Sequence, residues 1–245
     1  MRVRTALTVA GSDSGGGAGV QADLKTFLDR GVYGMSVLTA LTAQNTRGVH
    51  AVLPVEPAFV RAQLRAVFDD LPVDAMKTGM LGDAGVIDAV CDVLEALPVR
   101  PPLVVDPVMV AKGGAALLDP RALDALRRRL LPLAQVVTPN LPEAAALGEL
   151  DGAVLLKGGH GEGRWVIDRL LHDRVEVARW RHRRVDSPNT HGTGCTLAAA
   201  VAAELAHGRP LAEACGRAVA YVARRVRGAR ESLGGGHGPL LHGLR

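Results

Sequence analysis

Short apolar runs alternate along the chain with longer segments of helical periodicity, and this alternation constrains the fold more than any other feature. We expect strands at Ala6–Ala10, Ser36–Ala43, Ala75–Thr78, Leu103–Val105, Gln135–Thr138 and Ala153–Leu156, and a hairpin of Val166–Leu171 with Val175–Trp180. We expect helices at Ala18–Arg30, Pro57–Leu71, Ala84–Leu97, Pro120–Leu131, Thr193–Ala206 and Leu211–Arg227. The pattern predicts an α/β fold with a mostly parallel central sheet and helices on both faces.

Length and composition predict one domain over residues 1–245. The 245 residues are 48% hydrophobic, enough for one sizeable core, and no Pro-, Gly- or Ser-rich linker divides them. Cys91, Cys195 and Cys215 are odd in number and lack metal-like spacing, which favours a reducing compartment. We see no signal peptide and no apolar stretch long enough for a bilayer, so we predict a soluble cytoplasmic protein without a membrane partner.

The basic residues do not indicate a nucleic-acid partner. The net charge of +4 comes largely from arginine, and the cluster Arg127–Arg129 closes a predicted helix, where cations suit the dipole. Aromatic residues make up only 3% of the chain, too few for a surface that stacks bases. Lysines are scarce, so each of Lys25, Lys77, Lys112 and Lys157 is a candidate for a specific role.

The segment Asn189–Thr196 joins a polar, glycine-broken loop to the start of a helix. Gly192 and Gly194 allow a sharp turn and leave backbone amides uncovered. A helix N-terminus has unpaired N–H groups and a partial positive charge, so it attracts anions such as phosphate. Cys195 falls in the first turn, where a thiolate is favoured, although a lone cysteine is also a common small buried residue. This arrangement predicts a phosphoryl-transfer site.

Other polar residues follow predicted strands, at the edge where open parallel sheets bind ligands. The loop Gly11–Gly19 allows close backbone approach to a small ligand or is only a permissive turn. Asp106 could hold a metal through water, accept a proton or close a turn. Asn140 and Glu143 could cap a helix or order water around Mg²⁺. Lys157 suits a triphosphate or is an ordinary solvated loop lysine.

Six segments together resemble the hydroxymethylpyrimidine/phosphomethylpyrimidine kinases of thiamine biosynthesis, which are ribokinase-like. The segments are Gly11–Thr26, Thr39–Thr46, Asp106–Met109, Thr138–Glu143, Leu156–His160 and Asn189–Thr196. The resemblance implies a ribokinase-like three-layer sandwich, Mg²⁺ and a homodimer. It also implies two ATP-dependent steps, which convert 4-amino-5-hydroxymethyl-2-methylpyrimidine to its monophosphate and then to its pyrophosphate.

The resemblance also implies roles for individual residues. Gln44 would hydrogen-bond the aminopyrimidine edge in a pocket lined by Gly11, Ala18, Asp23, Met80 and Val108. The transferring phosphoryl group would be stabilised by the amides of Gly192, Thr193, Gly194 and Cys195. The ATP phosphates would contact Lys157, Asn140 and Thr193, and Asp106 and Glu143 would act around Mg²⁺. Phosphoryl transfer depends mostly on such positioning and charge stabilisation.

Cys195 stands where many ribokinase-like sugar kinases carry an aspartate base. A thiolate of pKa ~7 could accept the hydroxymethyl proton there, or the residue could mainly shape the anion hole. We expect His160 and His191 to shape the loops that contain them. The connection Ala144–Gly152 is shorter than is usual in the family, which puts the packing near the nucleotide in question.

Two other functions fit parts of this pattern. A pyridoxal or pyridoxine kinase of the same fold would also bind a flat heteroaromatic ring with a hydroxymethyl group, but Gln44 favours the aminopyrimidine. A non-catalytic nucleotide-sensing protein would not need Asp106, Glu143, Lys157 and the glycine loop together.

Overall fold

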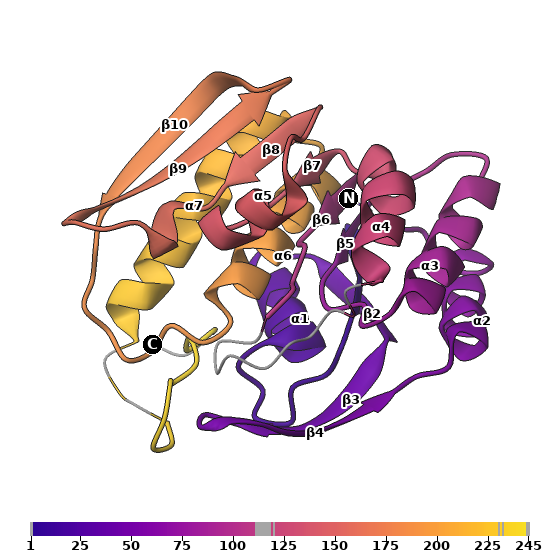
Figure 1. Cartoon of the computed structure of the whole chain (residues 1–245), viewed down its shortest axis with the longest axis horizontal. Coiled ribbons are helices and arrows are strands. Elements are labelled where there is room, and N and C mark those ends of the chain that lie inside the picture. The colour runs from indigo at the N-terminus through magenta and orange to yellow at the C-terminus, as the bar shows by residue number, and fades with distance from the viewer. Residues whose placement is uncertain (1, 111–118, 120, 230, 232, 244–245) are drawn as a thin grey trace.

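An eight-stranded sheet runs through the centre of the structure, a computed structural model that describes residues 2–110, 119, 121–229, 231 and 233–243 (Figure 1). The spatial order is β10 (Val175–Arg183), β9 (Trp165–His172), β8 (Ala153–Leu156), β7 (Val136–Val137), β6 (Leu103–Val105), β5 (Ala75–Thr78), β1 (Thr5–Ala10) and β2 (Tyr33–Leu38). In this order the strands from β8 to β2 are parallel to one another, and β9 is antiparallel to both of its neighbours, β8 and β10. The predicted α/β fold is confirmed.

Helices cover both faces of the sheet and form two separate apolar cores. One face carries α1 (Gly19–Asp29), α6 (Thr193–Ala206) and α7 (Leu211–Gly228). The other carries α2 (Pro57–Phe68), α3 (Ala84–Ala96), α4 (Ala122–Ala125) and α5 (Leu141–Leu147). Strand β1 serves both cores because its side chains alternate: Ala6 packs on the first, and Leu7 and Val9 on the second.

A separate hairpin of β3 (Ala40–Asn45) and β4 (Gly48–Pro54) corrects the predicted strand Ser36–Ala43. The chain leaves the main sheet at Thr39, whose buried side chain donates a 2.6 Å hydrogen bond to the carbonyl of Met80. Strand β4 was not predicted, because most of its side chains are exposed and it lacks a clear alternation.

The predicted helix Pro120–Leu131 is found only in part. Pro120 lies outside the described residues. Helix α4 covers Ala122–Ala125 and then continues as a π-turn over Leu126–Leu130. A short 3₁₀ turn at Leu131–Leu133, with a proline in its first positions, ends the helical segment.

A completely buried ion pair joins α1 to strand β5. Nζ of Lys77 lies 2.8 Å from Oδ2 of Asp23, and the hydroxyl of Thr8 donates a 2.6 Å hydrogen bond to the same oxygen. Both charged side chains have no exposed surface. Burial alone would lower the pKa of Lys77, but the Asp23 carboxylate, its hydrogen bond to the lysine and the charge of Asp106 act together to raise that pKa, so the lysine stays charged. The pair therefore fixes α1 against β1 and β5.

We expect Lys77→Met to leave the Asp23 carboxylate buried without its cation and to lower the free energy of unfolding by about 3–5 kcal/mol in urea denaturation. The double variant Lys77→Met/Asp23→Leu removes both charges and should recover most of this loss. Lys25→Met, on the exposed side of α1, is the matched control and should change stability by less than about 1 kcal/mol. Equal losses in the single and double variants would contradict this account of the pair.

Candidate active site

A cavity of about 1160 Å³ lies where the parallel strands end and α6 begins. Its wall includes backbone and side chains from loops that are far apart in the sequence. All but one of the predicted site residues line it: Gly11, Ala18, Gln44, Met80, Asp106, Val108, Asn140, Glu143, Lys157, Gly192, Thr193, Gly194 and Cys195. The cavity thus brings the predicted substrate, phosphate and metal residues together.

The exception is Asp23, which was expected to line the pocket. Its side chain is fully buried and is turned toward Lys77 and Thr8. Lys77, its partner, lies behind the cavity wall, since it borders the cavity but its side chain has no exposed surface. Lys77 is a residue whose role the sequence did not predict, although the scarcity of lysine had marked it for attention. A lysine inside the apolar strand β5 is unusual enough to be noticed.

The backbone of residues Gly192–Cys195, at the N-terminus of α6, is the segment predicted to bind phosphate, and we call it the anion hole. Gly192 precedes the helix with φ of 76°, and no side chain caps the helix there. A Cβ on Gly192 would lie 1.8 Å from the carbonyl oxygen of Gly17, so only glycine fits at this position. The amide of Thr193 donates a 3.4 Å hydrogen bond to the carbonyl of Thr190, and those of Gly194 and Cys195 are not capped by a side chain and can bind a phosphate.

Asp106, Glu143 and Lys157 form a charged cluster beside the anion hole. Nζ of Lys157 lies 2.7 Å from Oδ1 of Asp106 and 3.6 Å from Oε2 of Glu143. A Cβ built on Gly194 would be only 3.4 Å from this Nζ and 3.8 Å from Oδ2 of Asp106. The anion hole and the charged cluster are thus parts of one site, and a phosphate there would meet both.

Glu143 belongs to the charged cluster and also caps helix α5. Its amide donates a 2.8 Å hydrogen bond to Oδ1 of Asn140, and its carboxylate accepts one of 2.8 Å from the Asn140 amide. The predicted helix cap is therefore confirmed as a capping box. Burial, and then the nearby Asp106 carboxylate, raise the pKa of Glu143 against the opposing effect of Lys157.

The two carboxylates of the charged cluster fit a magnesium ion that arrives with nucleotide phosphates. Mg²⁺ prefers oxygen ligands, usually keeps several waters and takes one or two carboxylates from the protein. Asp106 and Glu143 both line the cavity. Among the described residues no group of three or more His, Cys, Asp or Glu side chains could hold a metal by itself. The donor set therefore suits a shared, partly hydrated ion rather than a dedicated protein site.

Of the two roles that the sequence left open for Cys195, a base or a residue that shapes the anion hole, the surroundings of the thiol disfavour the base. Cys195 is half-buried by its accessible surface, but the protein atoms packed around its thiol raise its pKa to about 11, and the carboxylates of Asp23 and Asp106 add to this increase. Lys77 and the amide of Gly19 act in the opposite direction but do not outweigh burial. The helix N-terminus therefore does not make this cysteine a thiolate at neutral pH.

Comparison with known proteins assigns the family. The model of the family described as phosphomethylpyrimidine kinase matches residues 13–241. The chain belongs to this family. A hydroxymethylpyrimidine/phosphomethylpyrimidine kinase from Rhizobium meliloti is 50% identical to this kinase over 258 residues, which cover 97% of this chain and 96% of that protein.

Two further proteins are similar to this kinase in different ways. A bifunctional thiamine-biosynthesis protein from Geobacter sulfurreducens is 52% identical over 255 residues, covering 96% of this kinase but only 51% of that protein. The ADP complex of Bacillus subtilis pyridoxal kinase has a TM-score of 0.86 at 38% identity and covers 98% of both chains. No helix among the described residues combines the length and the apolar character that crossing a membrane requires.

Gly194→Ala tests the anion hole directly. The added methyl group would stand beside Lys157 and Asp106, in the space proposed for the phosphate, so we expect kcat/KM for ATP-dependent phosphorylation to fall at least about tenfold. Thermal unfolding should occur at the same or a higher temperature, because alanine is favoured over glycine in a helix. Gly228→Ala, at the end of α7 where nothing lies near the added atom, is the control. A fully active Gly194→Ala enzyme would contradict this location.

Proposed function

We propose that this kinase uses ATP to phosphorylate 4-amino-5-hydroxymethyl-2-methylpyrimidine and then phosphorylates the resulting monophosphate to the pyrophosphate. The observation that carries the proposal is the junction of the anion hole with the charged cluster, in a cavity that also contains Gln44. A phosphoryl donor and a flat polar acceptor can therefore meet in one space. The relative at 50% identity is named for this substrate class, and the one at 52% identity is named for thiamine biosynthesis.

The acceptor end of the cavity suits an aminopyrimidine. Gln44 offers an amide, which can donate to a ring nitrogen and accept from an exocyclic amino group. Gly11, Ala18, Met80 and Val108 supply small or apolar wall for a flat ring. The hydroxymethyl oxygen would then point toward the anion hole, where it meets the phosphoryl group.

The donor end is built to hold and neutralise phosphate. The backbone of Gly192–Cys195 would stabilise the charge of the transferring group, and Lys157, Asn140 and Thr193 would hold the ATP phosphates. Asp106 and Glu143 would hold the water shell of Mg²⁺, which when bound supplies positive charge between the phosphates. In the second step the acceptor is itself a phosphate, and the same anion hole would serve again.

Cys195 is proposed to shape the anion hole rather than to act as a preformed base. Its thiol is protonated at neutral pH in the structure, because burial raises its pKa to about 11. Phosphoryl transfer through a loose transition state needs little prior deprotonation of the acceptor, so the hydroxymethyl proton can leave late. Cys195 then contributes its backbone amide and its shape.

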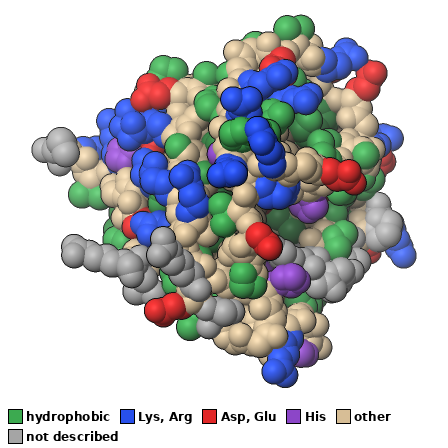
Figure 2. Space-filling model, turned by 90° about the vertical axis from the view of Figure 1, so that its left-hand side faces the viewer, with side chains coloured by type: hydrophobic (Ala, Val, Ile, Leu, Met, Phe, Trp, Pro, Cys, Tyr) green, Lys and Arg blue, Asp and Glu red, His purple; other side chains and the backbone are tan. Residues whose placement is uncertain are grey.

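The charge around the cavity suits an anionic co-substrate. Figure 2 shows Lys and Arg side chains gathered on the face that carries β9, β10 and α7 in Figure 1. Arg179, Arg181 and Arg183 are exposed on β10, and Arg183 also lines the cavity. The adjoining wall from α7 is apolar, with Val219, Val222 and Val226, and suits a nucleobase.

We further propose that the kinase acts as a cytoplasmic homodimer.

The proposal is tested by incubating the protein with ATP, Mg²⁺ and hydroxymethylpyrimidine, with pyridoxal in a parallel reaction, and following the products by mass spectrometry. We expect the pyrimidine monophosphate to appear first and the pyrophosphate to follow it. Omitting Mg²⁺ and adding a chelator should abolish both products. Lys157→Met, which removes the proposed phosphate ligand, should lower the rate at least about a hundredfold.

Phosphorylation of pyridoxal alone would overturn the proposed substrate while leaving the phosphoryl-transfer site in place. Pyridoxal kinase is the second candidate function, because the Bacillus subtilis enzyme of that name has a similar fold over 98% of both chains. Measuring kcat/KM for both acceptors under identical conditions decides between the two.

A further inference from the structure

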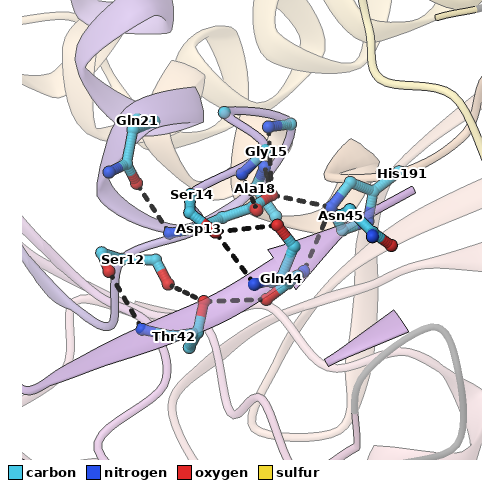
Figure 3. Close-up of polar contacts among 12 residues, drawn as sticks. Ser12, Asp13, Ser14, Gly15, Ala18, Gln21, Thr42, Gln44, Asn45 and His191 are labelled. Carbon is cyan, nitrogen blue, oxygen red and sulfur yellow. Dashed lines mark hydrogen bonds and ion pairs between the residues drawn. The ribbon is translucent and has the colours of Figure 1, made fainter. Parts of the chain in front are cut away.

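Asp13 is held as a carboxylate at the acceptor end of the cavity, and all of its partners are donors (Figure 3). Its Oδ1 accepts a 2.8 Å hydrogen bond from the amide of Gly15, and Oδ2 accepts from the amides of Gly17 and Ala18 at 3.0 and 2.8 Å. Burial alone would raise the pKa of Asp13, but hydrogen bonds from His191, Gly15 and Ala18 lower it below its ordinary value. Asp13 therefore offers only acceptor oxygens to its neighbours.

His191 must be a donor toward this carboxylate. Its Nε2 lies 2.8 Å from Oδ2 of Asp13, and an ionised carboxylate has no proton to give, so Nε2 carries the proton. The ring has little freedom to turn away. The ring packs closely on the backbone of Gly17, since a Cβ built on that glycine would lie only 2.5 Å from Cδ2 of His191. The backbone amide of His191 also donates a 3.0 Å hydrogen bond to the carbonyl of Gly238.

The amide of Gln44 lies between His191 and Thr42 (Figure 3). As placed, its Nε2 is 3.3 Å from Nε2 of His191 and its Oε1 is 3.3 Å from Oγ1 of Thr42, but the two ends of an amide have the same shape and are assigned from their hydrogen-bond partners. The Thr42 hydroxyl donates its only proton to the carbonyl of Ser12, in a hydrogen bond of 2.8 Å. Toward the amide, Thr42 can therefore only accept. The one proton on Nε2 of His191 goes mainly to Asp13 at 2.8 Å and reaches Gln44 only as the longer branch of a three-centre hydrogen bond, and this nitrogen has no lone pair with which to accept. Only one orientation satisfies both: the Gln44 oxygen faces His191 and its nitrogen faces Thr42.

We propose that Asp13 and His191 are positioning residues that fix the orientation of the Gln44 amide and so set the order of donor and acceptor that the cavity presents to its substrate. The inference rests on the proposed function, in which Gln44 binds the aminopyrimidine edge. In the fixed orientation one N–H and one lone pair of the amide remain for the ligand. An amide free to rotate would present them in the wrong order part of the time.

This arrangement explains why the loop Gly11–Gly19 and the loop before α6 must meet. The first loop supplies Asp13, and the second supplies His191 one residue before the anion hole. Ser14 also binds strand β3 at Gln44, since its hydroxyl donates a 2.8 Å hydrogen bond to the Gln44 carbonyl and accepts one of 2.9 Å from the Gln44 amide N–H. The contact between these two loops thus positions both the Gln44 amide, which orients the substrate, and the anion hole, which binds the phosphate.

The test is a double-mutant cycle between His191 and Gln44, read as KM and kcat for hydroxymethylpyrimidine. His191→Leu removes the donor, and we expect KM to rise about tenfold, equivalent to ~1.4 kcal/mol, while kcat falls less than threefold and KM for ATP is unchanged. His191→Gln can donate to both Asp13 and Gln44 and should restore KM to within about threefold of wild type. In a Gln44→Ala background, His191→Leu should add less than twofold, because its partner is gone.

Additive losses in the cycle, or equal defects in His191→Leu and His191→Gln, would overturn the positioning role and indicate a general distortion of the loop. If His191→Leu does not fold, judged by thermal unfolding, Thr42→Val provides the same cycle from the other side of the amide. A wild-type enzyme that does not phosphorylate hydroxymethylpyrimidine would overturn the proposed function and this inference together. Additive losses in an active enzyme would overturn this inference alone.

Discussion

The buried pair of Lys77 and Asp23 is the interaction on which the site depends. Neither side chain reaches water, so each needs the other, and together they lock α1 to β1 and β5 directly beneath the start of α6. Both charges act on the thiol of Cys195, and so does the carboxylate of Asp106. Asp106 in turn forms an ion pair with Lys157. Two lysines and three carboxylates, including Glu143, thus surround the anion hole. Backbone amides held by such a frame need no reorganisation when a phosphate arrives.

Glycines let the site close tightly around this frame. At Gly192 the helix start approaches the Gly17 carbonyl so closely that no side chain fits, and at Gly19, with φ of 56°, a Cβ would lie 2.3 Å from the Gly11 carbonyl. At Gly17 and Gly192 the loop Gly11–Gly19 and the loop before α6 therefore approach each other through backbone, with no room for a side chain between them. Asp13 and His191 complete the contact, so one junction carries both the phosphate and the substrate ends of the cavity.

The sequence predicted the fold and most of the site because both depend on local patterns. Buried parallel strands read as apolar runs, and strand-end residues such as Asp106 and Lys157 meet at one edge of any such sheet. Asp23 could not be placed from sequence, since its partner Lys77 is distant in the chain and only the packing of α1 shows that the carboxylate turns away from the cavity. The role of Cys195 was left open for the same reason: a helix N-terminus is visible in sequence, but the packing around the thiol, which raises its pKa, is not. The exposed strand β4 gave no apolar pattern to find.

The central claim is that phosphate binds where the anion hole meets the charged cluster. A crystal structure with hydroxymethylpyrimidine and a non-hydrolysable ATP analogue tests it most directly. The account predicts the terminal phosphate of the analogue on the amides of Gly194 and Cys195, within hydrogen-bond reach of Nζ of Lys157, with the hydroxymethyl oxygen of the pyrimidine facing it. A terminal phosphate bound elsewhere in the cavity, with those amides contacting only solvent, would contradict the account.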